Sequence, residues 1–242
     1  MKTLVRLDRQ AGATMVEFAL VMPFALLLVL GLIQIGLMYS AKAVVNEAAF
    51  MAARAGAVQN AQVDKMTAAM QKALIPFYQD TTNSDAATRL TAALASAKAD
   101  TDCASASQCF LKIEVLNPTP AAFADFGITS GASQGHTFIP NDNLEFRSHA
   151  VKGKTGGSGE SIQDANALKI KVTYGYELKV PLIATLFKAV LCGTDSGVDA
   201  FGRANSPLSI QGDDDCTNFY DQGRIPIVTY ATVQMQTPAW QQ

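Results

Sequence analysis

An uncharged, strongly apolar stretch near the start of the chain dominates its hydrophobic pattern. No charged residue occurs between Glu17 and Lys42, and residues 18–38 are almost wholly apolar. In an α-helix, 21 residues rise about 31 Å, which matches the thickness of the hydrocarbon core of a bilayer. The pattern therefore predicts a helix that crosses a membrane, with a kink at Pro23.

Good helix formers continue beyond this stretch. Ala, Met, Glu, Gln and Lys dominate residues 41–74. We therefore expect the helix to continue without a break until Pro76 ends it, although Gly56 weakens it. A second helix is expected from a Ser84 cap through an Ala-rich stretch to about Ala99, unless that stretch is a mobile surface arm.

Alternation of apolar and polar residues, which is typical of strands, appears later in the chain. The expected strands are residues 110–116, 167–180, 225–236 and, more weakly, 144–151. A short apolar helix is expected at residues 182–191, a flexible connector at 152–160 and a polar, turn-rich loop at 193–215. A long N-terminal helix before an antiparallel sheet, whose apolar face needs a cover, predicts an α+β fold.

The residues before the apolar stretch suggest how it is processed. A short leader with three basic residues ends at Gly12, and Glu17 is the fifth residue beyond this glycine. Prepilin peptidases cut this arrangement, here between Gly12 and Ala13. The new terminal amine, with a reference pKa of about 8, would be mostly protonated at neutral pH. In an assembly of such helices, the amine of one subunit can neutralise the buried Glu17 carboxylate of a neighbour.

Two other interpretations of this segment stay open. Ordinary secretion would cut after Ala41-Lys42-Ala43, but secretory apolar cores run about 7–15 residues and this one is longer. An uncleaved signal anchor explains the length and leaves the position of Glu17 to chance. A carboxylate at the centre of a membrane helix costs about 2.5–3.5 kcal/mol, and less near an end, so it is usually present for a reason. Prepilin processing accounts for both features.

Several segments together resemble one protein family. Residues 12–23 (GATMVEFALVMP), the apolar run and Gln34-Ile35-Gly36 resemble the N-terminal signature of TadE-like minor pilins of the tight-adherence (Tad/Flp) pilus. Residues 46–56, which include Arg54, are similar to the Ala-rich continuation of this family. The C-terminal part resembles the family more loosely, through Tyr174, Tyr176, Pro181 and Met235-Gln236-Thr237-Pro238. Gln34 stands where many members have Glu.

This resemblance implies a protein without catalytic activity, cofactor or small-molecule substrate. It implies cleavage by a dedicated prepilin peptidase and contacts with other pilins, at the initiation or the tip of a thin adhesive pilus. The corresponding domains are a leader (1–12), a membrane-anchoring helix with its periplasmic extension (13–60) and a periplasmic α+β domain (61–242). The alternative is a membrane-anchored assembly factor or binding protein, in which the helix is only a tether.

Charge agrees with a bacterial inner-membrane protein whose C-terminal domain is periplasmic. The 242 residues are 49% hydrophobic and carry a formal charge of −2. Removing residues 1–12, with a net charge of +2, would leave −4. No basic run follows the anchor, so nucleic-acid binding is not expected. The positive-inside rule places the basic leader in the cytoplasm and the remainder outside it.

Four cysteines, an even number beyond the anchor, predict disulfides in an oxidising compartment. They are Cys103, Cys109, Cys192 and Cys216. Of the three possible connectivities we favour the local pairs, Cys103–Cys109 and Cys192–Cys216. Neither pair has zinc-finger spacing, and His136 and His149 belong to no ligand motif, so no metal is expected.

Four other features have both a structural and a functional interpretation. Residues 131–135 (GASQG) match a hydrolase nucleophile motif, but no clear strand precedes them and no helix follows, which favours a surface loop. Residues 153–155 (GKT) lack the first glycine of a P-loop. Asp213-Asp214-Asp215 offers calcium ligands, although such runs are more often simply solvated. Gln34 either hydrogen-bonds across packed helices or marks the exit from the bilayer.

Overall fold

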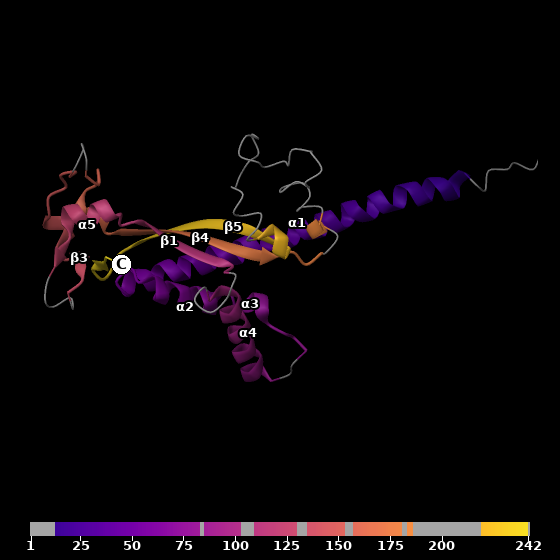
Figure 1. Ribbon diagram of the computed structural model, residues 1–242, viewed down its shortest axis with the longest axis horizontal. Coiled ribbons are helices and arrows are strands. Elements are labelled where there is room, and N and C mark those ends of the chain that lie inside the picture. Colours follow the sequence, from indigo (N-terminus) through magenta and orange to yellow (C-terminus); the bar gives the residue numbers. More distant parts are fainter. Residues whose placement is uncertain are drawn as a thin grey trace, which may run out of the picture.

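The computed structural model describes residues 13–82, 85–102, 109–129, 135–152, 157–180, 183–185 and 219–241. A long N-terminal helix is followed by antiparallel sheets and short helices, which confirms the predicted α+β class. The helix α1, Ala13–Val58, runs along most of the length of the molecule, and its N-terminal half extends beyond the described part of the domain (Figure 1). Anchor and domain therefore share one continuous helix.

The prediction of an unbroken helix as far as Pro76 is wrong. The helix α1 ends at Val58, and Asn60 and Ala61, with φ of 57° and 58°, reverse the chain into α2, Val63–Ala73. Asparagine tolerates this left-handed conformation better than most residues. Pro76 lies in the first turn of α3, Ile75–Tyr78, where a helix needs no backbone N–H from it. Helix propensity alone did not show where the chain turns.

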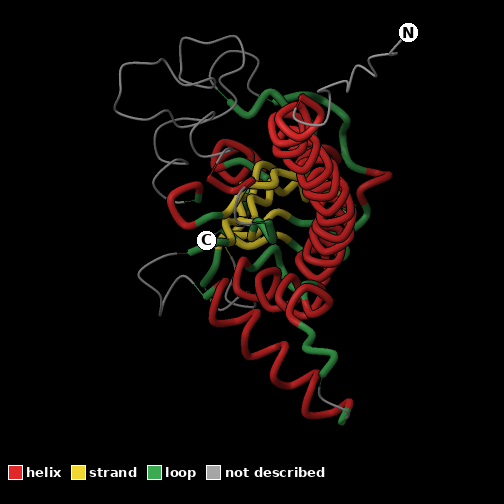
Figure 2. Tube along the Cα trace, turned by 90° about the vertical axis from the view of Figure 1, so that its right-hand side faces the viewer, coloured by secondary structure: helices red, strands yellow, loops and turns green. Residues whose placement is uncertain are grey.

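The predicted second helix is confirmed, with a different cap. It is α4, Ala86–Thr101, and the side chain of Asp85 accepts a hydrogen bond from the backbone nitrogen of Thr88 at 2.9 Å. Ser84, the predicted cap, lies outside the described residues. Ala93 and Ala97 are buried where α4 packs against α2 and α3, so α4 is docked on the domain although it projects from its side (Figures 1 and 2).

Three predicted strands form the main sheet. They are β1, Leu111–Asn117, β4, Ala167–Glu177, and β5, Arg224–Gln234, and they pair antiparallel in the order β1–β4–β5. Alternate residues of β4 and β5 are buried, as the alternation predicted. The central strand β4 is buried almost continuously over its second half.

A second, smaller sheet lies at the end of the molecule farthest from the start of α1 (Figure 1). Its strands, in the order β2–β3–β6, are Ile128–Thr129, Thr137–Ile139 and Ala239–Trp240. Two short helices accompany it, α5 (Pro120–Phe126) and α6 (Ile162–Ala165). None of these elements was predicted, because strands of two or three residues carry no readable alternation.

The weaker strand prediction, residues 144–151, is wrong. A 3-10 helix, η2, spans Leu144–Phe146, and an irregular segment follows it. Phe146 is 88% exposed, whereas Leu144 is partly buried against the core, so the segment does not present the alternating face of a strand. A second 3-10 helix, η3, spans Tyr220–Gln222 just before β5. Of the other predicted segments, residues 193–215 and most of 182–191 and 153–156 lie outside the described residues.

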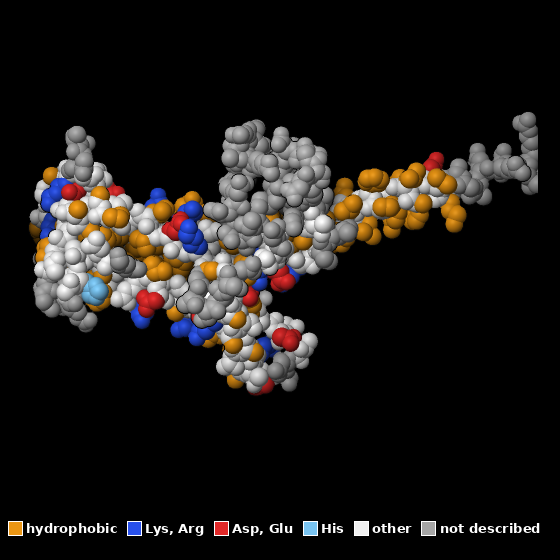
Figure 3. Space-filling model, viewed as in Figure 1, with side chains coloured by type: hydrophobic (Ala, Val, Ile, Leu, Met, Phe, Trp, Pro, Cys, Tyr) orange, Lys and Arg blue, Asp and Glu red, His pale blue; other side chains and the backbone are white. Residues whose placement is uncertain are grey.

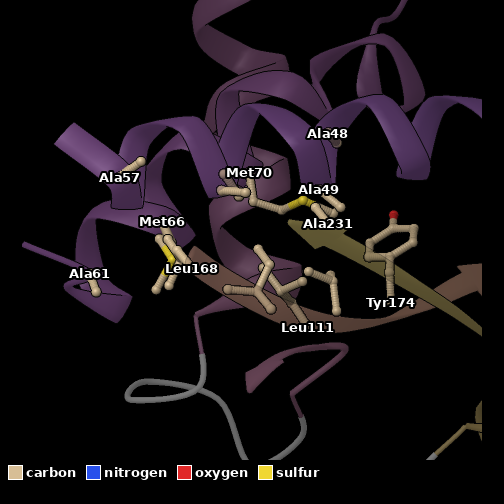
Figure 4. Packing of buried hydrophobic residues seen from close by; sticks show 14 of the residues in the cluster. Ala48, Ala49, Ala57, Ala61, Met66, Met70, Leu111, Leu168, Tyr174 and Ala231 are labelled. Carbon is tan, nitrogen blue, oxygen red and sulfur yellow. The ribbon is translucent and has the colours of Figure 1, made fainter. Parts of the chain in front are cut away.

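Small side chains line the face of α1 that meets the domain. Six fully buried alanines share this role: Ala41, Ala48, Ala49, Ala52, Ala53 and Ala57. They pack against β4, β5 and α2, and Figure 2 shows the sheet directly beside the long helix. A Cβ on Gly56 would lie 2.6 Å from Sδ of Met66 and 2.8 Å from Leu168, two residues that Figure 4 shows side by side. Alanine and glycine therefore allow the helix to approach the sheet and α2 closely.

Candidate functional site

The first half of α1 is exposed along its length. No residue from Met15 to Ile33 is buried, and large apolar side chains such as Phe18 and Phe24 are 64% and 75% exposed. Figure 3 shows this end of the molecule covered with hydrophobic side chains. Of the helices in the described part of the chain, α1 is the one long and apolar enough to cross a membrane. Exposed apolar surface of this extent is what a lipid-embedded segment presents.

The predicted processing residues lie at the start of this helix. Ala13 is the first residue of α1, and Glu17 lies one turn later with an exposed side chain. Residues four apart share a helix face and are separated by about 6 Å along the axis. Gly12 lies outside the described residues, so cleavage between Gly12 and Ala13 stays a prediction.

Gln34 is the first residue of α1, among those whose burial is described, that is fully buried. Its side chain is fully buried, and its Oε1 accepts a hydrogen bond from the backbone nitrogen of Val180 at 3.0 Å. Its Nε2 has no partner among the residues that the structure describes. Gln34 is thus held by the segment that follows β4. Of the two interpretations of Gln34, this contact favours the exit from the bilayer.

The segment that resembled the family at the C-terminus caps α1. The carbonyl of Ala57 accepts hydrogen bonds from the backbone nitrogens of Gln236 and Thr237, at 2.9 and 3.1 Å, and from Oγ1 of Thr237 at 3.2 Å. The backbone nitrogen of Asn60 donates to Oγ1 of Thr237 at 3.0 Å. The Asn60 side chain donates to the carbonyl of Pro238 at 2.8 Å. The carbonyls at a helix end need such partners, and here the segment between β5 and β6 supplies them.

A polar cluster joins α3, α4, β4 and β5. Arg224 donates to Asp100 at 2.8 Å, and the hydroxyl of Tyr78 donates to the same carboxylate at 3.1 Å. Tyr174 lies 3.0 Å from the Tyr78 oxygen and donates to it, because the single hydrogen of Tyr78 is already used. The Arg224 guanidinium also lies 4.0 Å from the centre of the Phe110 ring. Sequence reasoning missed this cluster, because its members are distant in the chain.

Burial raises the pKa of both tyrosines in this cluster. For Tyr78, the neighbouring Tyr174 and the charge of Asp100 add to the effect of burial and raise the pKa well above its ordinary value. Tyr78 therefore stays protonated and remains a donor at any physiological pH. The cluster borders a cleft of about 120 Å³ whose remaining lining includes Phe77, Tyr176 and Lys179. Tyr174, noted in the sequence for its resemblance to the family, thus has a structural role here.

Cys109 is the one predicted disulfide residue within the described ranges. It lies two residues before β1, and it takes part in a disulfide. Cys103, Cys192 and Cys216 lie outside those ranges. The two predicted pairs therefore remain predictions.

The other sequence motifs gather no catalytic or metal-binding group in the described parts of the chain. His136 stacks on Trp240, with ring centroids 4.9 Å apart and an angle of 7° between the planes. Residues 131–134, 153–155 and 213–215 lie outside the described residues. Among the residues that are described, no group of three or more His, Cys, Asp or Glu side chains is placed to hold a metal ion.

An exposed apolar helix that continues into the core of an α+β domain is typical of a membrane-anchored protein. Here the C-terminal half of the same helix belongs to the core of the domain. The family model described as TadE-like protein matches residues 12–54, which covers the anchor and most of the Ala-rich face of α1. This match confirms the N-terminal part of the resemblance seen in the sequence and relates the chain to the Tad pilus system. No curated protein and no solved structure matches the chain significantly.

Proposed function

We propose that this protein is a minor pilin or pseudopilin that takes part in the initiation or the tip of a Tad adhesion pilus. Its role is structural and involves no catalysis. The TadE-like match over residues 12–54 supports this proposal, because it covers both the predicted processing site and the exposed anchor. The partners are a prepilin peptidase and other pilins of the same system.

In this proposal the anchor lies in the bacterial inner membrane and the domain in the periplasm. The basic leader stays in the cytoplasm, as the positive-inside rule predicts, until cleavage between Gly12 and Ala13 removes it. Beyond the anchor, the cysteines Cys103, Cys109, Cys192 and Cys216 meet an oxidising compartment and form two local disulfides.

The observation that carries the proposal is the continuity of α1. The 46 residues from Ala13 to Val58 form one helix, which is free at its N-terminal half and is the central packing element of the domain at its C-terminal half. A helix that served only as a tether would need no such integration. Because the helix is shared, any movement of the anchor also moves the domain. A subunit that leaves the lipid and packs into a bundle of similar helices requires this coupling.

A deletion strain complemented with a tagged copy of the gene tests this function. We expect the deletion to abolish or sharply reduce surface pili, and complementation to restore them. A true subunit should be found in small amounts in the sheared pilus fraction with Ala13 at its N-terminus. A protein that is required for pili but stays wholly in the membrane fraction would instead be the assembly factor. Normal piliation of the deletion strain would refute the proposal.

A further inference from the structure

The surroundings of α1 change within one turn at Gln34. Below it, 21 residues from Ala13 to Ile33 rise about 31 Å, the thickness of a hydrocarbon core. Leu27, Leu30 and Gly31, on the Gln34 side of the helix, are half-buried, and the other residues from Met15 to Ile33 are exposed. At Gln34 itself the side chain is fully buried and is hydrogen-bonded to the segment that follows β4. The free helix is therefore long enough to cross a bilayer but not longer.

On the side of α1 that faces away from the domain, the residues that follow Gln34 are exposed. Ile35 is 56% exposed and Tyr39 is 80% exposed. Lys42, also exposed, is the first charged residue after the 24 uncharged positions that follow Glu17. Tyr39 lies about 7.5 Å and Lys42 about 12 Å beyond Gln34 along the axis. The headgroup layer spans roughly 5–7 Å on each side of the hydrocarbon core.

We propose that the domain rests on the bilayer surface from which it emerges, with the Gln34 turn at the boundary, Ile35 to Tyr39 of the open face of α1 in the phospholipid headgroups, and Lys42 just beyond them. Tyrosine favours this interface because its ring is apolar and its hydroxyl is polar. Lys42 supplies the cation that anionic headgroups attract, and its long stem reaches toward them. The surface is continuous with the lipid-facing part of α1. The proposal rests on the membrane anchoring in the proposed function and not on pilus assembly.

This seating fixes the depth of Glu17. Glu17 lies 17 residues before Gln34, or about 26 Å along the helix. With a core of about 30 Å, its carboxylate lies just inside the opposite edge, within reach of the headgroups there. Ala13, one turn further, reaches the opposite surface. The unassembled subunit can thus keep a carboxylate in its anchor at a lower cost than at the bilayer centre.

Tryptophan quenching by brominated lipids measures this depth in the full chain. The protein is reconstituted into phosphatidylcholine–phosphatidylglycerol vesicles whose acyl chains carry bromine at either a shallow or a deep carbon. Two variants place a probe at exposed positions, Tyr39→Trp and, as the matched control in the free part of the helix, Leu28→Trp. The native Trp240 is an internal reference: its backbone nitrogen donates to the carbonyl of Asn60, just past the end of α1 at Val58, which lies about 36 Å beyond Gln34 along the helix.

We expect no loss of Trp240 emission in the parent protein. Tyr39→Trp should lose more emission with shallow than with deep bromines, and Leu28→Trp should show the reverse order. Stronger deep quenching of Tyr39→Trp would show that the helix sinks past Gln34, and no quenching would show that the domain stands off the bilayer; either result overturns the proposal. Loss of quenching at Leu28→Trp would instead contradict the membrane anchoring on which the proposed function rests.

A charge variant tests the part played by Lys42. In the Tyr39→Trp background, Lys42→Glu should reduce shallow quenching in vesicles that contain phosphatidylglycerol and leave it unchanged in pure phosphatidylcholine. An equal reduction in both kinds of vesicle, or none in either, would remove Lys42 from the headgroup contact.

Discussion

Individual side chains in this protein divide into two kinds, those that hold the domain together and those that act in the anchor. Inside the domain, the carboxylate of Asp100 accepts hydrogen bonds from Arg224 and from Tyr78. Glu17 has no such role, because its side chain is exposed on the free half of α1. Substitutions at the two kinds of position should therefore affect different properties, stability at the first and assembly at the second.

Glu17→Ala should leave the domain folded and impair pilus assembly. The variant removes the carboxylate proposed to pair with the terminal amine of a neighbouring subunit, and the domain core does not contain Glu17. Surface pili are counted by electron microscopy, and processing is followed by gel mobility, where cleavage should persist because Gly12 is unchanged. Leu20→Ala, at an exposed apolar position of the same helix, is the matched control. Normal numbers of pili in the Glu17→Ala strain would rule out charge pairing.

Arg224→Met should lower the free energy of unfolding by about 1–3 kcal/mol, because it leaves the partly buried Asp100 without its cation. The side chains of this pair are 13% and 31% exposed. Lys179→Met provides the control: its pair with Glu177 is 52% and 57% exposed and should contribute less than about 0.5 kcal/mol. Chemical denaturation in detergent, followed by Trp240 fluorescence, compares the two variants. Equal effects would show that the cluster around Asp100 adds no stability.

The elements of the domain are arranged around α1, and two features determine that arrangement. The alanine face of α1 sets how closely β4 and β5 approach it. The end of the helix at Val58 is set by the C-terminal segment, which supplies hydrogen-bond donors to the carbonyl of Ala57. The same segment continues into β6 and so attaches the small sheet to the helix. The first and last elements of the domain therefore depend on each other.

Ala52→Leu should destabilise the domain by about 1–3 kcal/mol, because three extra carbons must fit where the helix faces its neighbours. Ala52 is fully buried. Ala43→Leu makes the same change at an exposed position of the same helix and should alter stability by less than about 0.5 kcal/mol. Thermal unfolding monitored by circular dichroism measures both. An Ala52→Leu variant as stable as the parent protein would mean that the contact between α1 and its neighbours can accommodate a larger side chain.

At the scale of the whole molecule, the protein is an anchor and a domain on one helical axis (Figure 1). This arrangement couples membrane position to domain position.

The mature protein should begin at Ala13. The leader and the position of Glu17 fit a prepilin peptidase, and the apolar run is too long for ready recognition by signal peptidase. N-terminal sequencing of protein purified from membranes decides the point. A start at Val44 would refute the pilin interpretation, and an intact Met1 would favour the uncleaved anchor. A strain without the prepilin peptidase is the control and should yield only the uncleaved chain.

The four cysteines should be oxidised in two local bridges, Cys103–Cys109 and Cys192–Cys216. Closing the second loop of about 25 residues should contribute roughly 3 kcal/mol by restricting the unfolded chain. Peptide mapping without reduction identifies the pairs. Free thiols, or a link between Cys109 and Cys192, would contradict this pairing.

Much of the fold followed from local pattern. Three strands of the main sheet and the helix α4 were predicted within a few residues, because their alternation or composition extends over seven or more positions. The small sheet and η2 were not, since their short segments acquire structure only from their neighbours. Of the candidate site, Ala13 and Glu17 lie in the first turns of α1, and their roles in processing and assembly stay predictions. The cluster around Arg224 could not be predicted, because Asp100 lies 124 residues away.

The sequence by itself determined the anchor, the position of Glu17 in it and the order of helix and strands, since charge, apolar length and periodicity are local properties of a chain. The tertiary structure alone decided where α1 ends and where the domain begins to cover it. Asn60 turns the chain with a partner 177 residues away, Thr237. The buried Gln34 accepts a hydrogen bond from Val180, 146 residues distant. Contacts of such sequence separation depend on the folded sheet, which brings both ends of the chain to one helix.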